Sequence, residues 1–273
     1  MANEITLSAA QRTSVLQLQN TVNLINRTND RLSTGLKVAS PIENARVFFE
    51  AKALSDRASD LNDKKDGIDQ GISAVSGALE ATDSIDVLVR QAKGLAIAAK
   101  SATGTELTSL VTQYNQILTQ IDNITADVTY QGLNLVNGTG QSLDVEFSNL
   151  TASQISIASV DLRTASTGLD ITSAANFSLT SNIDAAITEI DAALETLAGS
   201  AQTLGSNIGI LQARLDFTDN QVNVLQEGAD KLTLADITEE GANLVALQTR
   251  QQLGISALAF AGQSEQSVLA LFR

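Results

Sequence analysis

The chain has 273 residues and a formal net charge of −14, and it contains no Cys, no His and no Trp. Without Cys there are no disulfides and no thiolate chemistry, and without His the usual general base and the commonest transition-metal ligand are missing. These absences argue against an enzyme, and we expect no cofactor.

The first predicted helix lies near the N-terminus. Apolar residues recur there every three or four positions, with the polar Asn29 in the same series. This spacing places them on one face of a helix. The apolar members are Val15, Leu18, Val22, Ile25 and Leu32.

Two more helices are predicted before the middle of the chain. Core positions step by three and four through residues 51–99, and again through residues 107–128 after a break at residues 101–105. Pro41 is the only proline and precedes both helices, so it interrupts neither.

Residues from about 132 to 181 have a different composition, rich in Gly, Ser, Thr and Asn. Leu143, Val145 and Phe147 alternate with polar residues, which is the period of a β-strand. We predict a small β-rich excursion near the middle of the chain, placed at the tip of a helical bundle and too short for a separate domain.

The strongest helical signal covers residues 183–232. Fifteen core positions alternate spacings of four and three from Ile183 to Leu232, and only Thr218 among them is polar. Such a heptad seam buries one face of a long helix against other helices. Three long seams in one chain predict a mainly α fold, a long antiparallel helical bundle or coiled coil.

The C-terminal end mirrors the N-terminal end, because its apolar residues also follow helical spacing. A helix with an exposed apolar stripe is marginal alone in water, so each end needs a partner, either the other end or a neighbouring copy. The candidate contact residues are the N-terminal residues above together with Leu244, Leu247, Ile255, Leu258, Leu271 and Phe272.

The charge distribution agrees with this division. Residues 101–228 hold 14 acidic and 2 basic side chains, whereas residues 1–100 hold 12 of each. Near-neutral ends can pack against copies of themselves, and an acidic middle that faces water keeps the product soluble. The acidity disfavours nucleic-acid binding. No apolar run reaches the roughly 18 residues of a membrane span, and we expect no membrane partner and no ordinary secretory signal.

Two acidic pairs are the only candidates for chemistry. Glu239 and Glu240 are adjacent, so on a helix they point about 100° apart, which favours a surface or interface role. Asp216 and Asp219 resemble the start of a calcium loop, but no set of oxygen ligands follows them. We therefore predict no catalytic and no metal-binding residue.

Four segments in chain order resemble the bacterial flagellins: residues 30–37, 129–138, 235–240 and 268–273. The first contains the family signature residues Arg31, Leu32, Ser33 and Gly35. Most members continue after Ser40 with an Ala-Lys-Asp-Asp-like run, whereas this chain has Pro41, Ile42, Glu43 and Asn44. The local path of that connector is left open.

The resemblance implies a short flagellin with two helical layers. Residues 1–42 with 232–273 would form an inner coiled-coil polymerisation domain, and residues 43–231 an outer helical bundle that carries the β-rich segment at about 132–181. It implies a secreted structural protein that self-assembles into the extracellular filament of the bacterial flagellum for swimming motility. The implied partners are further copies of itself, the flagellar export apparatus and a chaperone, and the cap and hook-associated proteins.

Two other functions stay open at this point. A flagellar hook–filament junction protein shares the paired end helices, and an intracellular coiled-coil adaptor would also fit the periodicity. An electron micrograph of cells that lack the gene separates them: absent filaments support flagellin, loose subunits in the medium support a junction role, and normal filaments support an adaptor.

The resemblance also bears on immune recognition. Many flagellins are sensed by a Toll-like receptor through an Arg, a Leu and a Glu on the outer helices, and the matching positions here are Gln91, Leu95 and Gln113. Because neutral amides replace both charged side chains, we expect weak or absent activation of that receptor.

Overall fold

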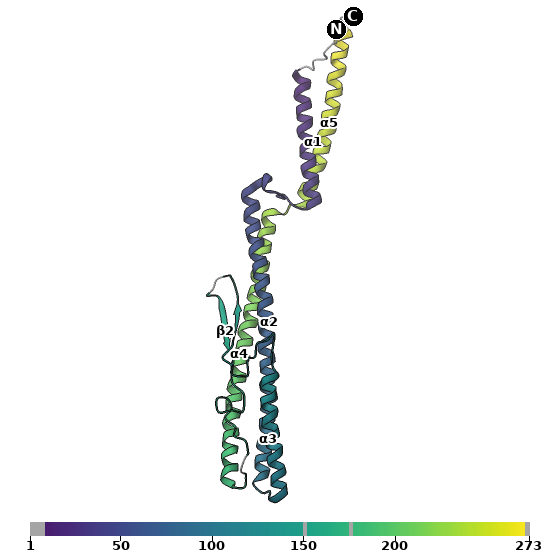
Figure 1. Ribbon diagram of the computed structural model, residues 1–273. Helices are drawn as coiled ribbons and strands as arrows, with labels where there is room; N and C mark the ends of the chain where they lie inside the picture. Colours follow the sequence, from purple (N-terminus) through teal and green to yellow (C-terminus); the bar gives the residue numbers. More distant parts are fainter. Residues whose placement is uncertain (1–8, 150–151, 175–176, 271–273) are drawn as a thin grey trace. The chain divides into compact units, whose positions relative to one another are not determined.

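The computed structural model describes residues 9–149, 152–174 and 177–270, and within them the chain forms five α-helices and one two-stranded sheet (Figure 1). The chain divides into two compact units. Unit 1 comprises Met1–Asp56 and Val224–Arg273, and unit 2 comprises Arg57–Asn223. The helices α2 (Pro41–Ala99) and α4 (Thr180–Thr233) contribute to both units, and each unit is described by itself.

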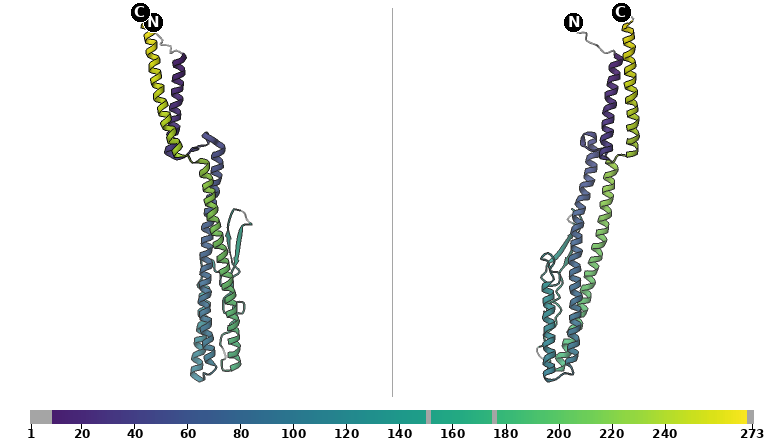
Figure 2. Two further views of the ribbon diagram at one scale, coloured as in Figure 1. Left: turned by 180° about the vertical axis from the view of Figure 1, so that it is seen from behind. Right: turned by 90° about the vertical axis from the view of Figure 1, so that its right-hand side faces the viewer.

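Unit 2 is a helical bundle. The larger part of α2, the whole of α3 (Gly104–Asp127) and the larger part of α4 run side by side in both views of Figure 2. Ion pairs join Lys65 to Asp219 and Lys100 to Asp184, each with an N–O distance of 2.6 Å. The residue number therefore rises along α2 while it falls along α4, so the two helices are antiparallel.

The core of unit 2 is formed by the heptad positions that the sequence singles out. On α4 the seam residues are buried or half-buried. Thr218 is buried too, and its hydroxyl is satisfied because it donates to the carbonyl oxygen of Arg214 at 2.8 Å. The largest fully buried side chains are Tyr114, Ile68, Ile85, Ile121, Leu162, Ile190, Leu197, Leu204 and Leu211. The predicted mainly α fold with an antiparallel bundle is confirmed.

The β-rich segment is a hairpin of β1 (Ser142–Glu146) and β2 (Gln154–Ala158), with Leu143 opposite Ile157 and Val145 opposite Ile155. Val145 packs on α2 where Gly71 lacks a side chain, since a Cβ there would lie 2.7 Å from Cγ2 of Val145. The predicted β-rich excursion is confirmed, but its predicted place at the tip of the bundle is wrong. Gly71 lies near the middle of α2, and this gap in the helix surface receives the hairpin.

The turn after α3 contains the second segment that resembles the flagellins. Tyr130 and Leu133 exchange backbone hydrogen bonds, and the turn between them uses the left-handed conformation at Gln131 and Gly132. The buried Asn134 then donates its side-chain amide to the carbonyl oxygen of Thr125 at 2.7 Å. Its side chain ties the following loop to the end of α3.

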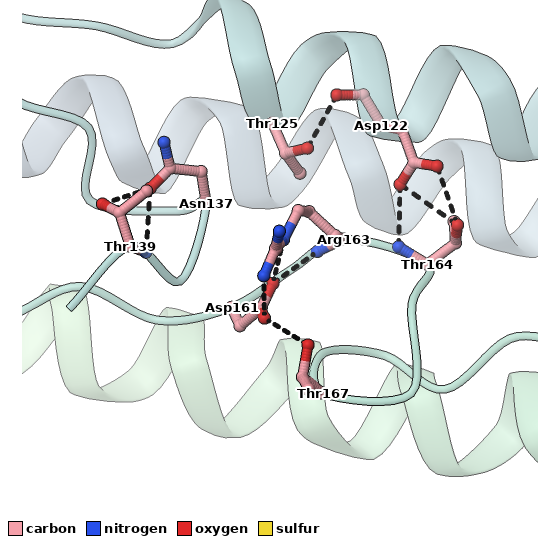
Figure 3. Close-up of polar contacts among 8 residues, drawn as sticks. All are labelled: Asp122, Thr125, Asn137, Thr139, Asp161, Arg163, Thr164 and Thr167. Atoms are coloured by element: carbon pink, nitrogen blue, oxygen red, sulfur yellow. Dashed lines mark hydrogen bonds and ion pairs between the residues drawn. The ribbon is translucent and has the colours of Figure 1, made fainter.

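A polar network holds the segment after the hairpin (Figure 3). The Asp161 carboxylate accepts hydrogen bonds from Nε and Nη2 of Arg163 at 2.9 and 2.7 Å and from the Thr167 hydroxyl at 2.9 Å. The bonds from Arg163, above all, hold the pKa of Asp161 below its ordinary value. Asp122 of α3 accepts the backbone N–H of Thr164 at 2.8 Å, which attaches the loop to the bundle.

In unit 1, α1 (Ala9–Thr34) and α5 (Ile237–Ala270) lie side by side (Figures 1 and 2). The segments that follow α1 and precede α5 also pair. Leu36 and Leu234 form an antiparallel bridge, and the backbone N–H of Ala235 donates to the carbonyl oxygen of Gly35 at 2.8 Å. Gly35 ends α1 in the left-handed conformation (φ +72°), which glycine adopts without steric cost.

The connector around Pro41 takes a kinked path. Asn44 has non-helical backbone angles (φ −158°, ψ 95°), so one turn at Pro41–Glu43 is separated from the long body of α2. The Asn44 side chain accepts the N–H of Val47 at 3.2 Å and thereby caps the helix that follows. Glu43 accepts the N–H of Ala39 at 2.7 Å.

The two units divide at residues 56–57 and 223–224. The resemblance places the boundary between the inner and outer layers at residues 42–43 and 231–232. That inner and outer assignment concerns the assembled polymer, and it stays a prediction.

Candidate polymerisation interface

The two end helices form an antiparallel pair whose register is set by two contacts. Leu18 of α1 occupies the gap at Gly254 of α5, where a Cβ would lie 2.7 Å from Cδ1 of Leu18. One end of the pair is joined by an ion pair, with Nη1 of Arg31 2.7 Å from Oε1 of Glu240. As the residue number rises from 18 to 31 on α1, it falls from 254 to 240 on α5.

The seam of α1 alternates apolar and hydroxyl side chains. Thr21 and Thr28 are buried, each with 7% of its surface exposed, while the apolar Leu18, Ile25 and Leu32 are only half-buried. The Thr21 hydroxyl donates to the carbonyl oxygen of Gln17 at 2.9 Å, so it is satisfied within its own helix. The most buried positions of α1 thus carry polar residues, and the apolar seam residues keep part of their surface in water.

The seam of α5 has the same character. Its half-buried positions recur every three or four residues, and they combine leucines with Gln251 and Gly254. The half-buried leucines are Leu244, Leu247 and Leu258.

The structure places most of the predicted interface residues near this seam. Val15 and Val22 lie beside it, half-buried, whereas Ile255 is 46% exposed. Leu271 and Phe272 lie outside the described residues. The interface assignment itself concerns other copies of the chain and stays a prediction.

The ion pair between Arg31 and Glu240 gives the family signature a structural role. The Glu240 side chain is 11% exposed and that of Arg31 is 29% exposed, so the pair is largely shielded from water. The sequence pattern favours a surface or interface role for Glu240 and does not identify Arg31 as its partner. Its position four residues before the seam residue Leu244 was the available signal. Asp236 caps the start of α5 by accepting the N–H of Thr238 at 2.8 Å.

A second apolar face lies on the opposite side of α5. Val245, Leu253 and Phe260 recur at intervals of eight and seven residues and are 63%, 66% and 71% exposed. Consecutive helical residues are rotated by about 100°, so these side chains project away from the seam that contains Leu244 and Gly254. A helix that is apolar on opposite sides is typical of one that becomes buried on both.

The described residues hold no cluster of acidic side chains able to bind a metal ion. Asp219, weighed above as part of a calcium loop, instead pairs with Lys65. None of the helices in the described ranges is long and apolar enough to cross a membrane. These features define a helical protein whose exposed apolar faces are suited to assembly.

Comparison with known proteins identifies the family. Residues 5–141 match the bacterial flagellin N-terminal helical region, and residues 180–272 match the bacterial flagellin C-terminal helical region. The chain is 30% identical to Flagellin FljK of Caulobacter vibrioides over 99% of both chains, and 29% identical to a flagellin of Brucella melitensis over the full length of both. A crystal structure of Bacillus cereus flagellin has a TM-score of 0.49 and 20% identity, and it covers 56% of this chain and 88% of its own.

The chain therefore belongs to the bacterial flagellins. It is a structural subunit of the extracellular flagellar filament, which serves swimming motility, and it is not an enzyme. The relatives match from end to end and are flagellins, so the junction-protein and adaptor alternatives lose their support.

Proposed function

We propose that polymerisation of this flagellin proceeds through the paired end helices, with residues 1–42 and 232–273 as the inner layer of the filament and residues 43–231 as the outer layer. The observation that carries the proposal is the apolar character of α5 on two opposite sides. One side faces α1, and the other presents Val245, Leu253 and Phe260 to water. In a filament of identical subunits, a further copy can cover that second side.

The energetics favour assembly over the isolated pair. Burying one large aliphatic or aromatic side chain contributes about 1.5–3 kcal/mol. Leu253 and Phe260 lose that contribution in the free subunit, where each is more than half exposed. Several such residues in each subunit offset the loss of translational and rotational freedom on association.

The proposal is tested by the variant Leu253→Ser, with Leu179→Ser as the matched control. Leu179 is 56% exposed and directly precedes α4 in unit 2. We expect Leu253→Ser to raise the critical concentration for seeded polymerisation at least about tenfold, since 1.4 kcal/mol corresponds to a factor of ten. Sedimentation after seeding with filament fragments measures it.

The control should polymerise as the unmodified subunit does, and both variants should keep their helix content by circular dichroism. Normal assembly of Leu253→Ser would contradict the inner-layer assignment, because α5 would then tolerate a polar group on its outer face.

The partners beyond further copies rest on the family resemblance. We propose export in an unfolded state through the flagellar export apparatus, with a chaperone in the cell and the cap and hook-associated proteins outside. The absence of Cys fits such a route, because no disulfide can obstruct it. A strain without a functional export apparatus should retain this flagellin in the cells, measured by immunoblotting of cells and medium.

We further propose that this flagellin is a weak agonist of the Toll-like receptor that senses many flagellins. Gln91 and Gln113 are exposed and neutral, and Leu95 is half-buried. The neighbouring Arg90 offers no substitute, because its guanidinium donates to both carboxylate oxygens of Asp86, at 2.7 and 3.1 Å.

A charge-assisted hydrogen bond contributes about 1.5–3 kcal/mol, so the loss of two would weaken binding by orders of magnitude. Reporter cells treated with purified monomer measure the response. The double variant Gln91→Arg with Gln113→Glu should restore activation. Full activation by the unmodified chain would contradict the assignment of these positions.

A further inference from the structure

Ile42 is the most exposed large apolar residue among those described, with 97% of its surface open to water. It lies in the kinked turn that the family resemblance did not foresee. Removing such an exposed aliphatic side chain from water on assembly is favourable.

The turn holds this side chain in place. Pro41 restricts its own backbone angle φ, and Glu43 donates its N–H to the carbonyl oxygen of Ser40 at 3.2 Å. The Glu43 carboxylate and the Asn44 amide then bond to the backbone on either side of the turn. Ile42 is therefore presented from a braced turn, which keeps the entropy lost on docking small.

Ile42 also stands beside other apolar surface in unit 1. It lines a hollow of about 710 Å³ together with the apolar Val38, Val47 and Leu232, and most of the other lining side chains are charged. Leu234 and Ile237 nearby in the chain are 49% and 52% exposed. The hollow also takes in Ala235 and Asp236, so the turn at Ile42 lies beside the segment that leads into α5. The outer face of α5 is the proposed polymerisation interface.

We infer that Ile42 is an anchor residue that inserts into a second copy of this chain in the filament. The inference rests on the proposed function, since it extends the interface of α5 to the connector. A helical filament is built from contacts between two different surfaces of identical subunits. A projecting side chain on one copy therefore meets a different surface of another copy, and does not meet its own counterpart. The Ala-Lys-Asp-Asp-like run of most members would present a Lys near this position, so the anchor is a feature of this sequence.

The first test uses Ile42→Ala with Leu179→Ala as the matched control. We expect Ile42→Ala to raise the critical concentration about 10- to 100-fold, in line with the loss of one buried aliphatic side chain. The control should leave it unchanged. An unchanged critical concentration for Ile42→Ala overturns the inference.

The second test locates the contact, and it exploits the absence of Trp in the chain. In Ile42→Trp the single indole should be fully quenched by acrylamide in the monomer. Mixed into filaments of unmodified subunits, it should emit at shorter wavelength and be shielded from the quencher, whereas Leu179→Trp should stay accessible.

Two results oppose the inference. Shielding of the indole already in the monomer would show that Ile42 packs within its own chain, and equal accessibility in monomer and filament would show that no copy covers it. If Leu253→Ser blocks assembly while Ile42→Ala does not, the inference fails and the proposed function stands. If neither variant affects assembly, both fail.

Discussion

The two units of this flagellin are both built from long antiparallel helices, yet they bury different residues. In unit 2 the seam positions carry aliphatic side chains such as Ile68, Ile190 and Leu204, which are at most 1% exposed. In unit 1 the most buried seam positions of α1 carry Thr21 and Thr28, and the apolar residues are half-buried or exposed. A heptad pattern is thus compatible with a fully buried apolar core, as in unit 2, and with apolar residues that stay partly exposed, as in unit 1.

This difference in burial indicates which part of the chain is stable in the free subunit. Three helices and a hairpin surround the core of unit 2, so its apolar surface is removed from water within one chain. The α1–α5 pair has only two helices, and two helices cannot cover every apolar side of each other. We therefore expect unit 2 to be stable as a monomer and the end helices to gain most of their stability in the filament.

Amide hydrogen exchange provides the broadest comparison of the two units. In the monomer, core amides of α2, α3 and α4 in unit 2 should exchange only through global unfolding, and those of α1 and α5 more than about 100-fold faster, because local opening free energies range from near zero to the global value. In the filament the end helices should become protected. Equal protection of α1 and α2 in the monomer would remove the proposed contrast.

A matched pair of leucine substitutions sharpens the contrast. Leu204→Ala in unit 2 should lower the free energy of unfolding of the monomer by about 2–5 kcal/mol, because it leaves a cavity in a closed core. Leu247→Ala in the α5 seam should cost the monomer less than about 1 kcal/mol, because the side chain is half-buried and water fills its place. Urea unfolding followed by circular dichroism measures both.

In the polymerisation assay, the two substitutions should rank in the opposite order, with the larger effect from Leu247→Ala. Leu247→Ala should raise the critical concentration under conditions where Leu204→Ala is still folded and assembles normally. Equal destabilisation of the monomer by the two variants would indicate that the α1–α5 seam is already a complete core.

The smallest expected effect concerns pH and unit 2. Because Arg163 lowers the pKa of Asp161, the folded state binds a proton there more weakly than the unfolded state, whose pKa is about 3.9. The contribution to stability is present above about pH 4 and is lost as the pH falls through the lowered folded pKa. Asp161→Asn should therefore cost about 1 kcal/mol at neutral pH and less in acid, since Arg163 is partly exposed.

Thermal unfolding between neutral pH and the acid limb checks this prediction. Asp144→Asn is the control, because Asp144 is exposed on β1 and belongs to no ion pair among the described residues. Identical pH profiles for Asp161→Asn and the unmodified chain would show that the network in Figure 3 adds no net stability.

Periodicity was sufficient to predict the helices and the fold class. The seam from Ile183 to Leu232 lies within a single helix, and the alternation around Val145 is a strand with its apolar side buried. These features are local, because a spacing of three and four or of two determines which residues share a face. Composition likewise limited the chemistry, since a chain without His or Cys lacks the most common catalytic side chains.

Tertiary structure decided which faces meet. The spacing on α1 predicts Val22 as a contact residue, whereas the folded chain buries Thr21, one position away, and leaves Val22 half-buried. Likewise, Glu240 and Arg31 are 209 positions apart in the sequence and pair only because α5 folds back along α1. The hairpin packs beside Gly71 because a missing side chain leaves room there. A sequence pattern specifies a face, but the partner of that face depends on contacts between distant segments, and only the folded chain determines those contacts.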